Sequence, residues 1–230
     1  MKTKITLMLA LCLICAYGCD ATVNKSITIA DNQKVAEGLS SVNGSIEIGS
    51  GCAVTGGCHT VNGSIRVGTD STVGDLETVN GRIRVAQKVI VDGDLSTVNG
   101  SIGCDSGSKV DGEVSSVNGG ISLTGTTVSD ALHTVNGDIT LNGSNGGNGI
   151  RTVNGDITLE NKSTLKGDIV IKERHGFSTH RPHIIITISG GSTVEGGIRV
   201  EDDEVDVEVR IDKESKVTGQ ISPRAKVTQI

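Results

Sequence analysis

The chain has almost no aromatic residues and almost no proline: one Phe, one Tyr, no Trp and two Pro among 230 residues. Enzymes of this size normally build much of their core on aromatic rings, because each ring buries more area than Val or Ile. The composition therefore argues against an ordinary mixed α/β enzyme. The 32 Gly do not recur at every third residue, which excludes collagen. Val, Ile and Leu are abundant and evenly spread, which argues against disorder.

The first 18 residues have the pattern of a secretory signal peptide. Lys2 and Lys4 precede an apolar run at residues 5–16, which is too short to span a bilayer. We therefore expect residues 1–18 to be removed on export. Without Lys2 and Lys4, the mature chain has 19 basic and 27 acidic residues, a net charge of −8. This charge repels a phosphate backbone, so nucleic acid is not an expected partner.

The end of this segment, Ala16-Tyr17-Gly18-Cys19, resembles the lipobox of bacterial lipoproteins. The resemblance implies cleavage before Cys19 and attachment of a diacylglycerol to its thiol. It places the mature chain in the bacterial cell envelope, membrane-anchored on the periplasmic side. Asp20 after the lipidated Cys implies retention in the inner membrane. A plain signal peptide with an incidental Cys is the alternative.

One motif recurs along most of the chain, in the form Thr/Ser-Val-Asn-Gly-x-Ile. Its Asn residues are spaced by 18 or 19 residues, and an eighth copy at residues 22–27 has Asn24 but lacks the glycine. The seven complete copies carry Asn43, Asn62, Asn80, Asn99, Asn118, Asn136 and Asn154. A repeat of this length is typical of a solenoid in which each coil is stable only when stacked on its neighbours.

Aligning the copies on the Asn gives columns of apolar residues. One runs from Leu39 through Cys58 to Ile150, a second from Ile29 through Cys104 to Leu159, and a shorter one from Val54 to Val110. We expect the Val and Ile of the motif to form two more inward columns, with a bend at Asn-Gly that uses the unusual φ of Gly. The sequence thus predicts an all-β fold: a single parallel β-helix (β-solenoid) of 18–19-residue coils.

Asn-Gly between apolar residues is also a strong hairpin signal. A hairpin would make the motif Val and Ile face opposite ways, so we prefer parallel coils to a meander. Six-residue spacings such as Val61, Val67 and Val73 are similar to those of left-handed hexapeptide helices. The large residues and seven-residue steps between such positions favour a right-handed or compact solenoid instead.

With its flanking Val-x-Gly-Asp-Leu, the repeated Thr-Val-Asn-Gly-Asp-Ile resembles a family of bacterial β-strand-repeat adhesin lipoproteins. The Val-x-Gly-x-Ile rhythm is similar, more loosely, to the polymer-forming bactofilins. The likeness covers about residues 22–171 and less closely 194–221. It implies a solenoid but brings no catalytic residues. Bactofilins are cytoskeletal, and the signal peptide departs from that pattern.

Several columns carry polar groups. We expect the seven motif Asn side chains to form a structural ladder in which each amide bonds to the next coil, and the Ser/Thr column two residues earlier to do likewise. Asp75, Asp94 and Glu113 align in one acidic column, and Asp138, Asp156 and Asp168 in another. Stacked carboxylates either hold Ca²⁺ or keep a solvated face soluble, and we favour the solvated face.

The cysteines give no zinc pattern. Cys58 and Cys104 fall in apolar columns and are expected to be buried thiols. Cys52 occupies a turn position that Ser71 also occupies, and a Cys52–Cys58 bridge stays open in an oxidising compartment.

The period breaks after Ile171. Residues 172–183 are predicted to be an inserted loop between the solenoid at 19–171, with its eight Val-Asn repeats, and C-terminal coils with an acidic cap at 184–230. The loop offers His175, Phe177, His180 and His183 for contact with a partner. Three His without a carboxylate or Cys pattern are a weak basis for a metal site.

From these features we predict a non-catalytic, lipid-anchored envelope protein whose rigid solenoid acts in adhesion or scaffolding. We expect a protein partner or self-association, and no cofactor or metal. One alternative is a module that binds Ca²⁺ or a ligand on the acidic columns. The other is head-to-tail polymerisation through the solenoid ends. Paired carboxylates also suit glycoside hydrolysis, but the mature chain offers no aromatic platform for sugars.

Overall fold

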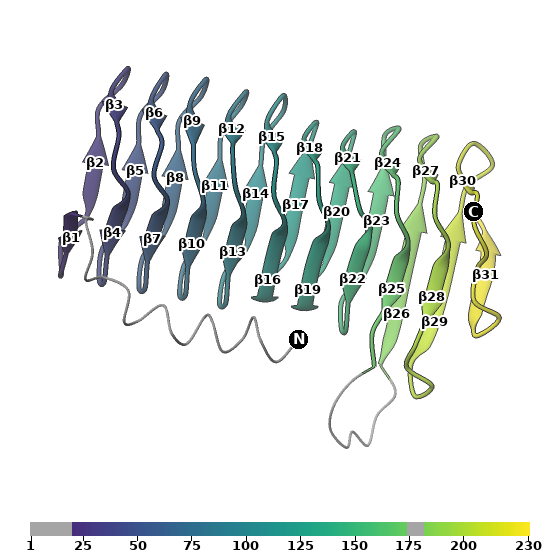
Figure 1. The fold of residues 1–230 in the computed structure, drawn as a ribbon. Coiled ribbons are helices and arrows are strands. Elements are labelled where there is room, and N and C mark those ends of the chain that lie inside the picture. The colour runs from purple at the N-terminus through teal and green to yellow at the C-terminus, as the bar shows by residue number, and fades with distance from the viewer. Residues whose placement is uncertain (1–19, 174–181) are drawn as a thin grey trace.

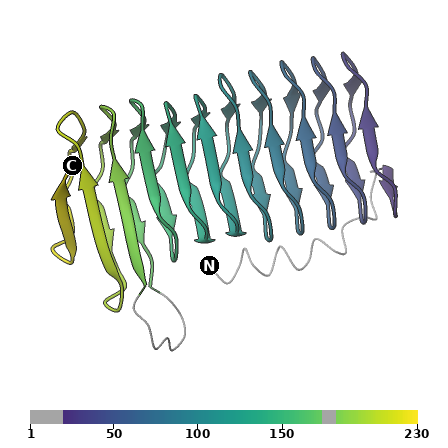
Figure 2. The same ribbon diagram turned by 180° about the vertical axis from the view of Figure 1, so that it is seen from behind.

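The computed structural model describes residues 20–173 and 182–230, which form a parallel β-solenoid of about ten coils (Figure 1). All strand pairs among these residues are parallel, so the hairpin alternative is wrong. The strands belong to three sheets that run the length of the rod, and each coil contributes one strand to each sheet. The same regular stack is visible from the opposite side (Figure 2).

The three sheets, named A, B and C, are defined by their strands in stacking order. Sheet A contains β1 (Asp20–Thr22), β4 (Leu39–Ser41), β7 (Cys58–Thr60), β10 (Leu76–Thr78), β13 (Leu95–Thr97), β16 (Val114–Asn118), β19 (Leu132–Asn136), β22 (Ile150–Thr152), β25 (Ile169–Ile171) and β28 (Ile198–Val200). Sheet B contains β2 (Ile27–Ile29), β5 (Ile46–Ile48), β8 (Ile65–Val67), β11 (Ile83–Val85), β14 (Ile102–Cys104), β17 (Ile121–Thr124), β20 (Ile139–Asn142), β23 (Ile157–Glu160), β26 (His183–Ile188), β29 (Asp206–Ile211) and β31 (Ala225–Gln229). Sheet C contains β3 (Lys34–Val35), β6 (Ala53–Val54), β9 (Thr72–Val73), β12 (Ile90–Val91), β15 (Lys109–Val110), β18 (Thr127–Val128), β21 (Asn145–Gly146), β24 (Thr164–Leu165), β27 (Thr193–Val194) and β30 (Lys216–Val217).

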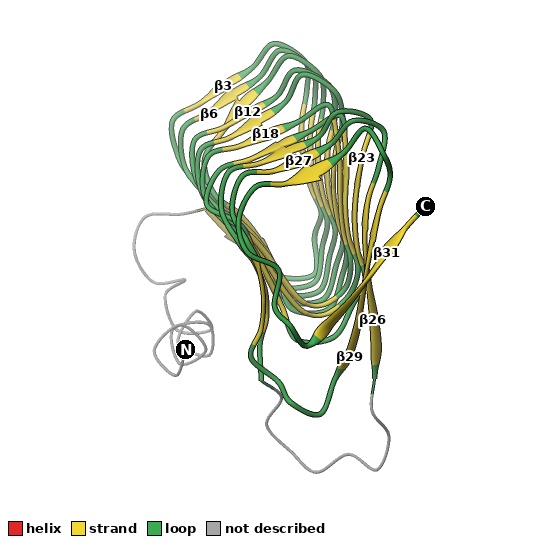
Figure 3. Cartoon of the chain, turned by 90° about the vertical axis from the view of Figure 1, so that its right-hand side faces the viewer, coloured by secondary structure: helices red, strands yellow, loops and turns green. Residues whose placement is uncertain are grey.

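The solenoid is right-handed, as the sequence favoured. Figure 3 views it from its C-terminal end, with the strands of sheet B on the right and those of sheet C at the top. The chain passes from sheet A to sheet B and then to sheet C as it approaches the viewer, which is a counter-clockwise path. Advance toward the viewer on such a path defines a right-handed helix.

The apolar columns fill the space between the three sheets. Leu76 of sheet A, Val85 of sheet B and Val91 of sheet C are each fully buried, and their counterparts in the neighbouring coils are stacked on them in register. Side chains alternate across a strand, so a three-residue strand such as β10 or β11 presents its first and third residues inward, and a two-residue strand such as β12 presents its second. The three predicted columns are therefore confirmed as the core.

The prediction that the Val of the motif forms an inward column is wrong. Val61 and Val79 are only half-buried, whereas Thr60 and Thr78 are buried. The reason is the period of two: Leu76 and Thr78 face the core, so Val79, one residue later, does not. The Thr or Ser of the motif, rather than its Val, is the inward residue.

The role of the motif glycine also differs from the expected one. From Gly44 to Gly137 these glycines have no positive φ, so no left-handed backbone requires them. A Cβ on Gly100 would instead lie 1.9 Å from the carbonyl oxygen of Gly81 in the preceding coil, which no side chain tolerates. Lys25 occupies the same position in the first described coil, where no described coil precedes it. Close stacking of backbones, not turn geometry, selects Gly here.

The left-handed conformation occurs at a different turn, between sheets B and C. Gly51, Asp70, Lys88 and Gly107 hold this position in four successive coils, with φ between 56° and 80°. Half of these residues are not Gly, although a positive φ is costly for side chains other than Asn and Asp. This explains why the turn is inconspicuous in the sequence.

The solenoid continues beyond the point where the repeat period fails. β25 ends at Ile171 and β26 begins at His183, yet Ile157 pairs with Ile186 in sheet B as Ile139 pairs with Ile157. The step between these coils is 29 residues instead of 18, and in the sequence the extra residues fall between β25 of sheet A and β26 of sheet B. His183 belongs to the next strand rather than to the inserted segment.

The predicted signal peptide at 1–18 and the predicted lipidation site Cys19 lie outside the described residues. Within the residues that the structure describes, no helix is long and apolar enough to cross a membrane.

Candidate functional surfaces

The Asn side chains form a continuous ladder along the turn between sheets A and B. Each Nδ2 donates to the Oδ1 of the Asn one coil earlier, with N–O distances of 2.6 to 3.0 Å from Asn24 through Asn154. The amides are exposed, and each inner member both donates and accepts. The ladder thus joins eight coils, and its amides are committed to one another.

The hydroxyls two residues before the Asn do not form a similar ladder. Thr60 Oγ1 donates to the carbonyl of Gly44, Thr78 to that of Gly63, and the pattern continues to Thr134. Each hydroxyl is buried and bonds to backbone of the preceding coil. Thr152 is the exception, since its Oγ1 is buried without a partner among the described residues.

The acidic columns accept hydrogen bonds from the backbone of the following coil. Asp75 Oδ1 accepts from the amide of Asp94 at 2.8 Å, and Asp94 Oδ1 accepts from that of Glu113 at 2.7 Å. Asp138 and Asp156 do the same in a second column. Asp168 was expected in this second column, but it precedes Ile169 of sheet A and therefore belongs with Asp75.

These carboxylates therefore have a structural task that does not need a cation. Among residues 20–173 and 182–230, no group of three or more His, Cys, Asp or Glu is placed to hold a metal ion. The acidic columns consequently give no support to the Ca²⁺-binding alternative.

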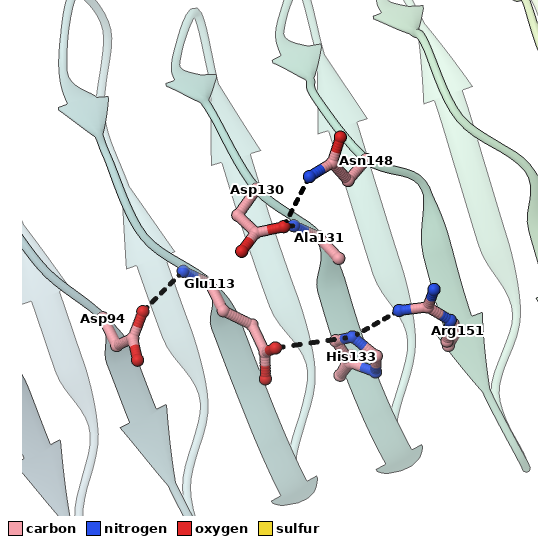
Figure 4. A network of polar contacts seen from close by, with 7 residues as sticks. All are labelled: Asp94, Glu113, Asp130, Ala131, His133, Asn148 and Arg151. Carbon is pink, nitrogen blue, oxygen red and sulfur yellow. Dashed lines mark hydrogen bonds and ion pairs between the residues drawn. The ribbon is translucent and has the colours of Figure 1, made fainter.

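A polar network lies on the outer face of sheet A (Figure 4). His133 Nε2 is 3.6 Å from Glu113 Oε2 and 3.1 Å from Arg151 Nη1, while Asp130 Oδ1 accepts from the side-chain amide of Asn148 at 2.7 Å. A neutral ring with a bare Nε2 accepts from Arg151, whereas a protonated ring donates to Glu113. The residues come from successive coils, so the network again links coil to coil.

The three cysteines of the described solenoid are buried and form no disulfide, which answers the open question of a Cys52–Cys58 bridge. Burial, aided by the charge of Asp105, raises the pKa of the Cys104 thiol to about 12. A thiol with this pKa stays protonated and unreactive at neutral pH.

A column of buried hydroxyls at the start of sheet C was only partly visible in the sequence. Ser71 accepts from the amide of Cys52, Ser108 from that of Val89, and Ser144 from that of Thr126. The alignment of Cys52 with Ser71 was the available signal. Because Cys, Val and Thr also occupy the column, its polar character was not evident.

The C-terminal coil carries carboxylates held by nearby donors. Asp212 accepts from Ser215 and from the amide of Gly190, and these hydrogen bonds lower its pKa. The guanidinium of Arg210 likewise lowers the pKa of Glu208, with Thr228 contributing. Both carboxylates therefore stay ionised to a lower pH than they would without these donors.

The predicted contact residues of the inserted segment divide into two groups. His175, Phe177 and His180 lie outside the described residues. His183 is the first residue of β26, where its exposed ring lies 3.7 Å from Glu208 Oε2.

A cluster of arginines on sheet B was missed in the sequence. Arg66 of β8, Arg84 of β11 and Arg82, just before β11, all face outward and line two adjoining hollows in the surface. Ser101, Gly103 and Ser122 continue the same surface toward β17. The available signal was the tripeptide Ile-Arg-Val, which forms both β8 and β11 and places an Arg at the outward position of each strand.

The fold and these surfaces define a parallel β-solenoid repeat protein of about ten turns. Comparison of the chain with protein families, curated proteins and solved structures gives no match. The resemblance to adhesin lipoproteins and bactofilins is therefore supported for the solenoid architecture alone, and it assigns the chain to no family.

Proposed function

We propose that the protein is a non-catalytic, lipid-anchored component of the bacterial cell envelope whose rigid solenoid acts in adhesion or scaffolding. The observation that carries this proposal is how the repeated polar side chains are used. The amides of the Asn ladder, the hydroxyls of Thr60 and its counterparts, and the carboxylates of Asp75 and Asp94 all bond one coil to the next. Groups that elsewhere perform chemistry serve here to stiffen a rod.

Rigidity suits a surface that has to hold a partner at a distance from a membrane. About ten coils at about 4.8 Å each give a rod about 48 Å long. The net charge of −8 expected for the mature chain suits a rod that is exposed to solvent.

The anchor is tested by lipidation at Cys19. Cells expressing the chain are labelled with radioactive palmitate, and Cys19→Ala is compared with Cys58→Ala, which removes a buried thiol of the solenoid. We expect Cys19→Ala to lose both the label and the membrane fraction, and Cys58→Ala to retain both. Label that persists in Cys19→Ala places the anchor elsewhere and contradicts the proposal.

Head-to-tail assembly is a second candidate, because both described ends leave strands with one free edge. At one end a hollow beside β2 is lined by Ile27 and Ile29, and at the other β31 exposes half of Val227. Free parallel edges with apolar side chains pair with other strands. Size-exclusion chromatography with light scattering tests this, because a monomer that persists over a hundredfold concentration range excludes assembly through the ends.

A further inference from the structure

The arginine cluster places like charges directly opposite one another. Arg66 and Arg84 are register partners on adjacent strands, about 4.8 Å apart at the backbone. Arg82 lies two residues before Arg84 on the same face, at about 7 Å. Like charges opposite each other destabilise a sheet. In a chain with net charge −6, three arginines at one spot need an explanation.

The surrounding residues compensate this charge only in part: Asp105 and Asp138 line one of the two hollows, whereas the residues described around the other, which include all three arginines, contain no acidic side chain. Arg66 Nη1 pairs with Glu47 Oε1 at 3.1 Å, and Arg82 Nε donates to Ser101 Oγ at 2.9 Å. Arg84 has no acidic partner within ion-pair distance among the described residues. Arg84 lines both hollows.

Gly103 is the next residue of this outward column, and packing does not require it. A Cβ at this position would meet only the carbonyl oxygen of Ser122, at 4.0 Å, in contrast to the close contact at Gly100. Glycine weakens a strand, and in such a place it often marks a close approach by a ligand. Here it leaves the surface beside Arg84 open.

The lining of the hollows indicates the class of ligand. Guanidinium groups match the geometry of carboxylates and phosphates. The floor supplies the hydroxyls of Ser101, Ser122 and Thr140, while Ile102 and Ile121 are almost fully buried, so no apolar anchor point is exposed. Strands β8 to β20 are paired on both sides, which leaves no edge for an added peptide strand. An anionic, polyhydroxylated chain fits this surface better than an acidic peptide.

We propose that the face of sheet B formed by Arg66, Arg82, Arg84 and Gly103 binds an anionic glycan, with the carboxylate or phosphate of a sugar unit held by Arg84. The absence of aromatic rings removes stacking on neutral sugars but leaves ionic recognition intact. The inference rests on the proposed adhesive function, to which it adds a ligand class.

Binding is measured by isothermal titration calorimetry on the purified full-length chain in detergent at low salt. The probes are an oligogalacturonate, its methyl ester, a glycerol-phosphate polymer and poly-L-glutamate of matched charge. We expect the oligogalacturonate or the glycerol-phosphate polymer to bind, and whichever binds identifies the anionic group. The neutral ester and poly-L-glutamate are expected to bind at least tenfold more weakly.

Two variants and a control locate the site. Arg84→Gln should weaken binding about tenfold, the scale of a lost charge-assisted contact. Gly103→Val should weaken it similarly while leaving the melting temperature unchanged or higher, since the added side chain enters open space. Arg151→Gln makes the same charge change on sheet A and should leave binding unaltered.

Three results would overturn the inference: no binding of either the oligogalacturonate or the glycerol-phosphate polymer, equal binding of poly-L-glutamate, or equal losses in Arg84→Gln and Arg151→Gln. The assay uses purified protein, so it does not depend on lipidation at Cys19. Failure of the glycan site and failure of the membrane anchor are therefore distinguishable.

Discussion

Replacing Gly100 with Ala tests whether backbone stacking selects the motif glycine. The added Cβ would lie 1.9 Å from the carbonyl oxygen of Gly81, whereas Cβ contacts closer than 3.0 Å essentially do not occur. The two coils must part by about 1.1 Å at this point. That movement also stretches the 2.8 Å bond between Asn99 and Asn80.

The expected effect is a net loss of stability. Overpacking of this kind costs about 3 kcal/mol at the upper end of its usual range, and a backbone carbonyl yields less than a side chain does. Ala also lowers the conformational entropy of the unfolded chain, which offsets up to about 1 kcal/mol of this loss. The remaining loss of about 2 kcal/mol corresponds to a fall in melting temperature of about 4 to 8 °C for a chain of this size.

Gly103→Ala is the matched control, three residues away in the same coil. Its Cβ has no heavy atom closer than 4.0 Å, so only the entropic gain applies, and the melting temperature should hold or rise by about 1 to 4 °C. Thermal unfolding followed by circular dichroism measures both variants. If Gly100→Ala melts at or above the wild-type temperature, the stacking explanation is wrong.

Four further outcomes follow from the same structure. Asn99→Ala removes two ladder hydrogen bonds and Asn154→Ala removes one, so Asn99→Ala should lower the free energy of unfolding, measured by chemical denaturation, by about 1 kcal/mol more than Asn154→Ala does. Equal losses would show that the ladder bonds do not stabilise the fold. The pKa of Asp212 is lowered in the folded state, so its stabilisation is present above about pH 4 and is lost as the pH falls through the folded value. Asp212→Asn should flatten the acid-side fall in melting temperature, and an unchanged profile would contradict this. Iodoacetamide should leave Cys104 unmodified in the native chain and alkylate it in denaturant, as mapped by mass spectrometry; native labelling would show that the thiol is accessible. Millimolar Ca²⁺ or a chelator should leave the melting curve unmoved, because the acidic columns already accept backbone hydrogen bonds, and a shift would restore the cation alternative.

The sequence predicted the coil and its apolar columns because stacked coils repeat the same environment at the same position. It predicted less well which side a residue faces. Val79 is as apolar as Val85, and only the alternation from Leu76 through Thr78 shows that Val79 points away from the core. The role of Gly100 was similarly hidden, because the close contact is with a residue 19 positions earlier and has no local signature.

The arginine cluster escaped prediction for a different reason. Aligning repeats draws attention to what recurs, and the Asn, Gly and Thr columns recur because every coil needs the same bonds to its neighbour. Arg84 and Gly103 occupy one outward column in which neighbouring coils carry Arg, Ser and Thr. Outward positions of this kind are free of the stacking constraint, so specificity for a partner can differ from coil to coil without loss of the fold. In this protein the recurring residues hold the rod together, and the residues that break the repeat are where a binding function should be sought.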